Sequence, residues 1–176
     1  MKAKYQGELD GLCGPYAIVN AFEKAGVSGC TEKLFQVACG AASPRRWPKI
    51  LWEGTDFEDL KRMALSCNES LAAKKRLTIT FPFEKRPPSS NEAYWRRFDE
   101  IFEDPGVTCG IIGMNKPSDH WIVVRHDGGR VRFTDSTAGR PNVRKNRSSI
   151  FAGLRRKKSS QWRIDRSELV VFAKRT

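Results

Sequence analysis

Cys13 lies in the stretch Asp10-Gly11-Leu12-Cys13-Gly14-Pro15-Tyr16-Ala17, where a helix is expected to begin. A cysteine at a helix entrance is a candidate nucleophile, because the outward-pointing amide groups favour a thiolate and can stabilise an oxyanion on an attacked carbonyl. Gly14 is expected to leave the approach of a substrate unobstructed. The alternative interpretation is that Cys13 is a small residue packed at the start of a helix.

A histidine and a carboxylate much later in the chain are expected to meet on one β-hairpin. Asp127-Gly128 is a strong signal for a two-residue turn, because a type I′ turn needs positive φ at both central positions. With these residues as the loop, His120 lies directly opposite Asp135, at a Cβ separation of about 4.5–5.5 Å. A slip of one residue would place the two side chains on opposite faces.

The apolar residues of the hairpin support this register. It predicts Ile122 opposite Phe133, Val124 opposite Val131, Val123 opposite Arg132 and Arg125 opposite Arg130. The first two pairs form an apolar strip that ends at His120, and the arginine pairs mark the other face as outward. Trp121 belongs to that second face and is a candidate substrate-binding residue. A surface or merely packed histidine is the alternative interpretation of His120.

A cysteine, a histidine and a carboxylate are sufficient for nucleophilic cysteine catalysis. A Cys13 thiolate would attack a carbonyl, His120 would protonate the leaving amine, and water would hydrolyse the acyl-enzyme. This chemistry requires no metal or organic cofactor. If an amine replaced water, the same residues would catalyse acyl transfer, and the sequence does not separate the two reactions.

The elements that must position these residues are helices in the first part of the chain and strands in the second. Helices are expected at about 15–25, from an N-cap at Thr31, from Thr55 or Asp56, and from a capping box of Ser89 and Glu92. Strands are expected at 77–81, 107–114, in the 120–135 hairpin and within 167–174. This order predicts an α+β fold in a single domain that spans residues 1–176.

The composition is typical of a soluble globular protein, with 39% hydrophobic and 30% charged residues among 176. No apolar run approaches the roughly 20 residues of a membrane span, and the first residues lack the apolar stretch of a signal peptide. A cytoplasmic protein is therefore expected, with non-classical secretion as an effector left open. The five cysteines include no CxxC pair, which argues against a zinc site or a disulfide framework. Cys67 and Cys109 fit apolar patterns and are expected to be buried.

The formal net charge of +12 is concentrated in one segment. The basic segment at about 140–158 contains no acid and includes Arg140, Arg144, Lys145, Arg147, Arg155, Arg156, Lys157 and Lys158. Such a stretch attracts polyanions, and the candidate partners are a nucleic acid, an acidic membrane and an acidic protein. The alternative is a solvated loop, and no nucleic-acid-binding motif accompanies the charge.

Three parts of the sequence together resemble the papain-like cysteine peptidases, and most of all the peptidase domains of bacteriocin-processing transporters. These parts are Gln6 with the stretch from Asp10 to Ala17, His120-Trp121-Ile122-Val123-Val124, and Phe133-Thr134-Asp135-Ser136. The resemblance implies a papain-like fold, in which an N-terminal helical part carries the nucleophile at a helix N-terminus and packs on an antiparallel sheet.

The resemblance also assigns roles to residues. It implies Cys13 as nucleophile, His120 as base and Asp135 as the carboxylate that orients the histidine, in this order along the chain. Gln6 would supply a side-chain amide to the oxyanion, although it precedes Cys13 by seven positions where the family pattern usually has six. The same order of catalytic residues resembles transglutaminase-like enzymes.

Three functions follow as hypotheses. The first is a thiol hydrolase that cleaves a peptide or isopeptide bond in a peptide or protein substrate. The second is a basic protein that binds nucleic acid or an acidic protein through the 140–158 segment. The third is a catalytically idle papain-like fold that serves interaction. Rapid thiol labelling that depends on Cys13 favours the first, and salt-dependent polyanion binding without Cys13 favours the second.

Overall fold

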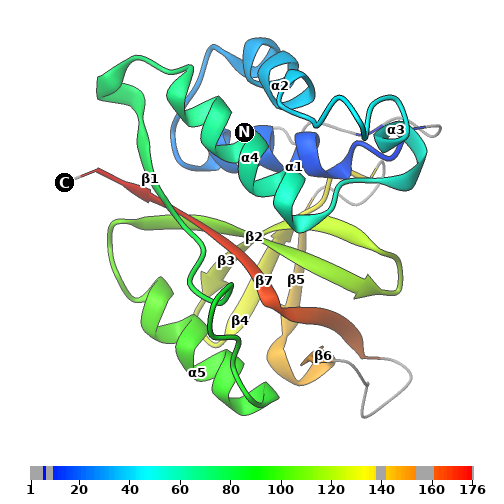
Figure 1. Ribbon diagram of the computed structural model, residues 1–176. Coiled ribbons are helices and arrows are strands. Elements are labelled where there is room, and N and C mark those ends of the chain that lie inside the picture. The colour runs from blue at the N-terminus through cyan, green and yellow to red at the C-terminus, as the bar shows by residue number, and fades with distance from the viewer. Residues whose placement is uncertain (1–5, 7–9, 138–141, 154–160, 176) are drawn as a thin grey trace.

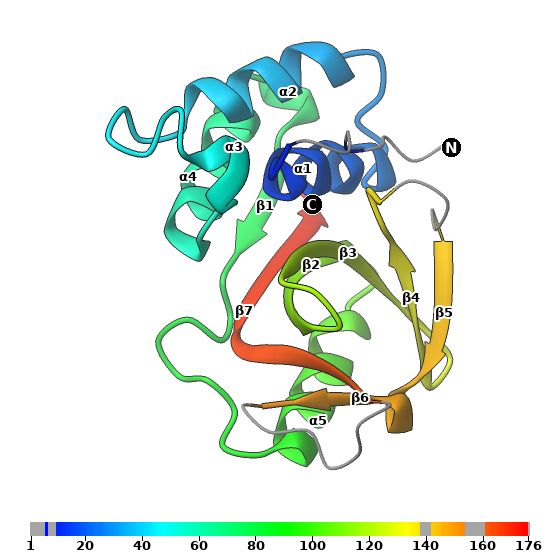
Figure 2. The ribbon, with the colours of Figure 1, turned by 90° about the vertical axis from the view of Figure 1, so that its right-hand side faces the viewer.

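Helices cover both faces of an antiparallel sheet in the computed structural model, which describes residues 6, 10–137, 142–153 and 161–175. Four helices lie together on one side of the sheet and the fifth on the other (Figures 1 and 2). The first group is α1 (Cys13–Lys24), α2 (Thr31–Gly40), α3 (Ile50–Glu53) and α4 (Phe57–Glu69), and the fifth helix is α5 (Asn91–Phe102). The predicted α+β fold is confirmed.

The strands form one seven-stranded sheet within the described residues. They are β1 (Leu77–Thr80), β2 (Val107–Lys116), β3 (His120–Asp127), β4 (Arg130–Thr134), β5 (Asn142–Asn146), β6 (Ile150–Ala152) and β7 (Trp162–Lys174). Their order is β1-β7-β2-β3-β4-β5 with antiparallel neighbours, and β6 pairs in parallel with β7. The central strands β2, β3 and β7 are therefore the frame on which both helical layers pack.

Alternate residues of the central strands enter two separate hydrophobic cores. Ile111 and Val123 join the core under α1, α2 and α4, whereas Ile112 and Ile122 join the core under α5. Val123 is completely buried, so the prediction that its face of the hairpin points outward is wrong there. The reason is that this sheet face carries a helical layer, which the local alternation of residues does not reveal.

The β3–β4 hairpin turns one residue later than predicted. Its loop is Gly128-Gly129, and both glycines have positive φ, at 53° and 78°. Two glycines adopt this conformation without the steric cost that a Cβ imposes, so they displace Asp127 from the turn.

The pairing changes accordingly. Observed partners are Val123 with Thr134, Val124 with Phe133, Arg125 with Arg132 and His126 with Val131, which corrects all four predicted pairs. Each residue of β3 now faces a position two further along β4, so the side chains keep their faces. His120 and Asp135 are therefore diagonal neighbours on one face rather than directly opposed.

Helix starts agree with the sequence only in part. Asp56 caps α4 as predicted, and its carboxylate accepts a hydrogen bond from the Asp59 amide at 2.8 Å. The helix that was expected from residue 15 begins at Cys13 instead. In the last helix the cap is Ser90, one residue after the predicted Ser89. Its hydroxyl oxygen accepts a hydrogen bond from the Ala93 amide at 3.1 Å.

Thr31 is not the N-cap that the sequence predicts. It lies inside the first turn of α2, the cap position belongs to Cys30, and no side chain caps the helix there. The Thr31 hydroxyl instead donates a hydrogen bond to the Glu23 carboxylate at 2.7 Å, which ties α2 to α1. The Thr31 hydroxyl thus bonds to a residue of another helix instead of capping its own helix.

The basic segment contains regular structure that the sequence analysis did not foresee, since β5 and β6 both lie in it. Its described cations contact other parts of the protein. Arg144 pairs with Asp127 at 2.7 Å, Arg147 pairs with Asp99, and the Lys145 ammonium lies 4.2 Å from the ring centre of Trp162. Arg140 and residues 155–158 lie outside the described part of the chain.

Candidate active site

Cys13 is the first residue of α1, and its side chain is buried, with 7% of the residue exposed. The loop before it is fixed from both sides. The Asp10 carboxylate accepts a hydrogen bond from the Leu12 amide at 3.1 Å, and the Gly11 amide donates to the Leu51 carbonyl. Cys13 therefore stands at the positive end of a 12-residue helix, where the first amide groups have no partner within the helix.

Gly14 lets another segment of the chain approach α1 closely. A Cβ built on Gly14 would lie 2.5 Å from Oγ1 and 2.7 Å from Cβ of Thr55, so a larger residue does not fit without a shift. Thr55 thus packs directly against the helix turn that carries Cys13. The expected contribution of Gly14 to substrate binding stays a prediction, because what the structure places beside it is Thr55.

The structure brings His120 and Asp135 together. Nε2 of His120 lies 2.8 Å from Oδ1 of Asp135, and both side chains are more than nine-tenths buried. The amide of Thr137 donates a second hydrogen bond to the same carboxylate oxygen at 2.8 Å. Asp135 lies just beyond the end of β4, and this local turn holds it in place.

These contacts set the protonation of both groups. Burial lowers the pKa of His120, but the hydrogen bond to Asp135 and the interaction with Cys13 outweigh it and raise that pKa to about 9. Burial raises the pKa of Asp135, but the hydrogen bonds from His120 and Thr137 hold it below its ordinary value. At neutral pH the pair is therefore an imidazolium and a carboxylate.

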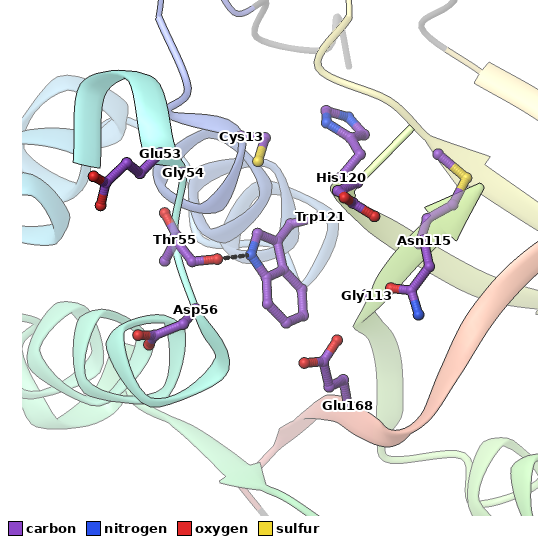
Figure 3. A pocket seen from close by; sticks show the side chains of 12 residues that line it. Cys13, Glu53, Gly54, Thr55, Asp56, Gly113, Asn115, His120, Trp121 and Glu168 are labelled. Carbon is purple, nitrogen blue, oxygen red and sulfur yellow. Dashed lines mark hydrogen bonds between the residues drawn. The ribbon is translucent and has the colours of Figure 1, made fainter. Parts of the chain in front are cut away.

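Cys13 and His120 line the same pocket, which has a volume of about 190 Å³. The sulfur and the imidazole ring lie beside each other at its edge (Figure 3). Since Nε2 binds Asp135, Nδ1 is the ring nitrogen available to the sulfur. The three predicted catalytic residues thus form one connected constellation built from α1, the start of β3 and the end of β4.

Trp121 lines the same pocket and connects two of its walls. Its indole Nε1 donates a hydrogen bond to the Thr55 carbonyl at 2.6 Å (Figure 3), and its ring stacks on Phe57 with centres 6.0 Å apart. The residue next to His120 is thereby fixed to the segment that packs on Gly14.

We expect Trp121→Phe to lower the free energy of unfolding by about 1–3 kcal/mol, because it leaves the buried Thr55 carbonyl without its donor. Urea denaturation followed by circular dichroism measures this change. Trp52→Phe is the control, since Trp52 is 66% exposed and should alter stability by less than about 0.5 kcal/mol. Equal effects of the two substitutions would contradict a structural role for the indole hydrogen bond.

Gln6 lies near the site without facing the pocket. Its backbone amide donates to the Ser136 carbonyl at 2.7 Å, and its side-chain amide donates to the Asp10 carbonyl. Gln6 therefore connects the loop after Asp135 with the loop before Cys13. It is not among the described residues that line the pocket, and its predicted oxyanion role stays a prediction.

Sequence reasoning missed the acidic residues of the pocket, above all Glu168. Its carboxylate lies on the pocket wall below Trp121 (Figure 3). Burial, and then the charges of Asp165, Asp56 and Asp119, raise the pKa of Glu168 to about 7. The signal available in the sequence was a glutamate directly before the apolar run 169–172, a position where a strand buries one face.

Within the described residues, no group of three or more His, Cys, Asp or Glu side chains is arranged to hold a metal ion. None of the helices in the same part of the chain has the length and apolar character of a membrane span. The five cysteines are all free thiols, and Cys67 and Cys109 are buried as expected.

Comparison with known proteins found no matching family model, no matching curated protein and no matching solved structure.

Proposed function

We propose that the protein is a cysteine-nucleophile hydrolase that cleaves a peptide or isopeptide bond with Cys13, His120 and Asp135, on a papain-like fold. The observation that carries this proposal is the 2.8 Å contact between His120 Nε2 and Asp135 Oδ1, made by a histidine that shares a pocket with Cys13. The free thiols suit a reducing compartment such as the cytoplasm.

The reaction follows from the geometry of these groups. The Cys13 sulfur attacks the scissile carbonyl, and the resulting oxyanion receives hydrogen bonds at the N-terminus of α1, where the Cys13 amide is free of an intrahelical partner. The His120 imidazolium transfers its Nδ1 proton to the leaving amine as the carbon–nitrogen bond breaks. Neutral His120 then takes a proton from water, whose oxygen attacks the thioester as the carbon–sulfur bond breaks, which releases the acid and regenerates the attacking Cys13 sulfur and the His120 imidazolium.

Asp135 acts through His120. As an ionised carboxylate it fixes the ring orientation and stabilises the imidazolium, which keeps Nδ1 directed at the sulfur. The resemblance to papain-like peptidases rests on the same three residues in the same order and on a nucleophile at a helix N-terminus. It supports the proposal without naming a substrate.

Selective labelling of Cys13 tests the nucleophile. We expect iodoacetamide at neutral pH to alkylate Cys13 before the half-exposed Cys30 and Cys39, because Cys13 is the one cysteine in the described structure that has a histidine imidazolium beside it as well as a helix N-terminus. Burial raises the pKa of both Cys67 and Cys109 to about 12, so these thiols should react last. Peptide mapping by mass spectrometry measures the five rates in one experiment. Faster alkylation of Cys30 or Cys39 than of Cys13 would contradict the proposal.

Cleavage itself is tested with a peptide library and Cys13→Ala as the control. New peptide ends that form only with the intact cysteine support hydrolysis, and their absence at equal protein concentration contradicts it. Adding a primary amine separates hydrolysis from acyl transfer, because an amide product in place of the free acid identifies a transferase that uses the same thioester.

A further inference from the structure

We propose that the pocket wall formed by Glu168 binds the cationic side chain of a lysine or arginine next to the scissile bond of the substrate. This inference rests on the proposed function and gives it a substrate class. It is carried by the charges that line the pocket, by the position of Glu168 and by an unpartnered hydroxyl of another residue that lines the same pocket.

The pocket is acidic although the protein is strongly basic. The carboxylates that line it are Glu53, Asp56, Asp119 and Glu168, and among the described lining residues there is no lysine or arginine. The whole chain carries 32 basic and 20 acidic residues. The field inside the pocket therefore opposes the net charge and attracts a cation.

Two of these carboxylates are partly neutralised and two are not. Arg46 lies 3.8 Å from both Glu53 and Asp56 at the outer edge. In the described part of the chain, no ion pair joins Asp119 or Glu168 to a basic residue. Asp119 is exposed and Glu168 is half-buried, so Glu168 carries the uncompensated charge that lies deepest in the pocket.

The Glu168 carboxylate lies in a space that is open because residue 113 is a glycine. A Cβ built on Gly113 would lie 1.9 Å from Glu168 Oε2, so the carboxylate rests directly on the backbone of β2. Its neighbours Asp165, Asp56 and Asp119 repel it rather than stabilise it. A cation bound here would relieve this repulsion, which gives the site a physical reason to prefer a charged ligand.

A second observation points to a ligand. Thr55 is 9% exposed and lines the same pocket, and its buried Oγ1 has no hydrogen-bond partner in the described structure. Buried hydroxyls of native proteins are usually partnered. The oxygen of such a hydroxyl can accept a hydrogen bond from an N–H group of an ammonium or guanidinium ligand.

The arrangement fits a long basic side chain. Figure 3 shows the indole of Trp121 between the Cys13–His120 pair and the Glu168 carboxylate. With a scissile carbonyl at the sulfur, the apolar stem of a lysine or arginine would lie along the indole and its charged end would reach Glu168. A neutral side chain of the same length would pack equally well and leave the carboxylate without a partner.

The test compares two ligands of nearly the same shape, one with a charged guanidinium and one with a neutral ureido group. Nα-acetyl-arginine methylamide and the corresponding citrulline compound are titrated into Cys13→Ala protein, and binding is measured by chemical-shift changes in NMR spectra. We expect arginine to bind about tenfold to hundredfold more tightly, because the hydrogen bonds it makes are charge-assisted. Equal affinity for the two compounds overturns the inference.

Variants locate the effect. Glu168→Gln in the same background should remove the preference for arginine, whereas Glu100→Gln, the same chemical change on an exposed position of α5, should retain it. Gly113→Ala should also weaken arginine binding, because its methyl group displaces the carboxylate. A preference that survives Glu168→Gln contradicts the assignment to this residue.

The pH dependence supplies an independent readout. Because the pKa of Glu168 is raised to about 7, its charge and the preference for arginine should decline as the pH falls below that value. The other titratable groups around it are Asp165, Asp56 and Asp119 together with Glu53, Cys13 and His120 of the pocket. The decline should be absent in Glu168→Gln, and its persistence there would assign the titration to one of these neighbours and contradict the inference.

These outcomes are distinguishable from a failure of the proposed function. The binding experiments use protein without the nucleophile, so they do not depend on catalysis. A reactive Cys13 with no preference for arginine overturns the subsite alone. An unreactive Cys13 with a Glu168-dependent preference overturns the hydrolase and leaves a cation-binding pocket.

Discussion

His120→Ala is expected to slow the alkylation of Cys13 by a peptidyl vinyl sulfone by about 10²–10⁴-fold, the usual contribution of a positioned acid–base group. The imidazolium at Nδ1 stabilises the attacking thiolate and supplies the proton that the adduct requires, and alanine does neither. Intact-protein mass spectrometry at neutral pH follows the gain in mass with time.

The chain offers a matched control in its only other histidine. His126 lies at the far end of β3, where Nε2 is 3.6 Å from Asp99, and His126→Ala should leave the labelling rate unchanged. Unfolding by heat should show that His120→Ala remains folded. If both variants react at the rate of the wild-type protein, the imidazole at position 120 does not activate the sulfur.

Asp135→Ala is expected to lower the pKa of His120 from its value of about 9. Burial depresses the pKa of this histidine, and the hydrogen bond that its ring donates to the Asp135 carboxylate opposes burial most, ahead of the interaction with Cys13. With only two histidines in the chain, their ring protons are readily assigned in an NMR titration, and His126 is the internal reference. A His120 pKa that stays near 9 without Asp135 would contradict this electrostatic account.

The ion pair between His120 and Asp135 also makes the free energy of unfolding depend on pH, and the pKa shifts of the two residues give the direction. The pKa of His120 is raised above 6.5, so its contribution to stability is complete below that value and is lost as the pH rises through about 9. The pKa of Asp135 is lowered below 3.8, so its contribution exists above that value and is lost on acidification. The stability difference between wild type and Asp135→Ala should therefore be largest in mildly acidic solution.

Several parts of the fold follow from local sequence because the local signal and the tertiary structure agree. Asp56 and the apolar periodicity after it predict α4, and the apolar run from Val107 predicts β2. His120 and Asp135 meet although the predicted register is wrong. The turn moved to Gly128-Gly129, which shifts each pair by two positions and so preserves the side-chain faces.

Other features depend on contacts that no local pattern encodes. The burial of Val123 requires the helical layer above the sheet, and β5 within the basic segment gains its partner from β4. Glu168 became a pocket residue because Gly113, 55 positions earlier, leaves space for its carboxylate. Such a pairing between distant strands is a consequence of sheet order, which the sequence analysis did not predict.

Thr55 contacts both halves of the candidate site. Its side chain packs on Gly14, the neighbour of Cys13 in the chain. Its carbonyl accepts a hydrogen bond from Trp121, the neighbour of His120. Thr55, in the short link between α3 and α4, thus acts as a spacer between the residues that carry the proposed nucleophile and the proposed base. It follows that a substitution at position 55 should change the distance between the Cys13 sulfur and the His120 ring while the three side chains of the proposed triad stay the same.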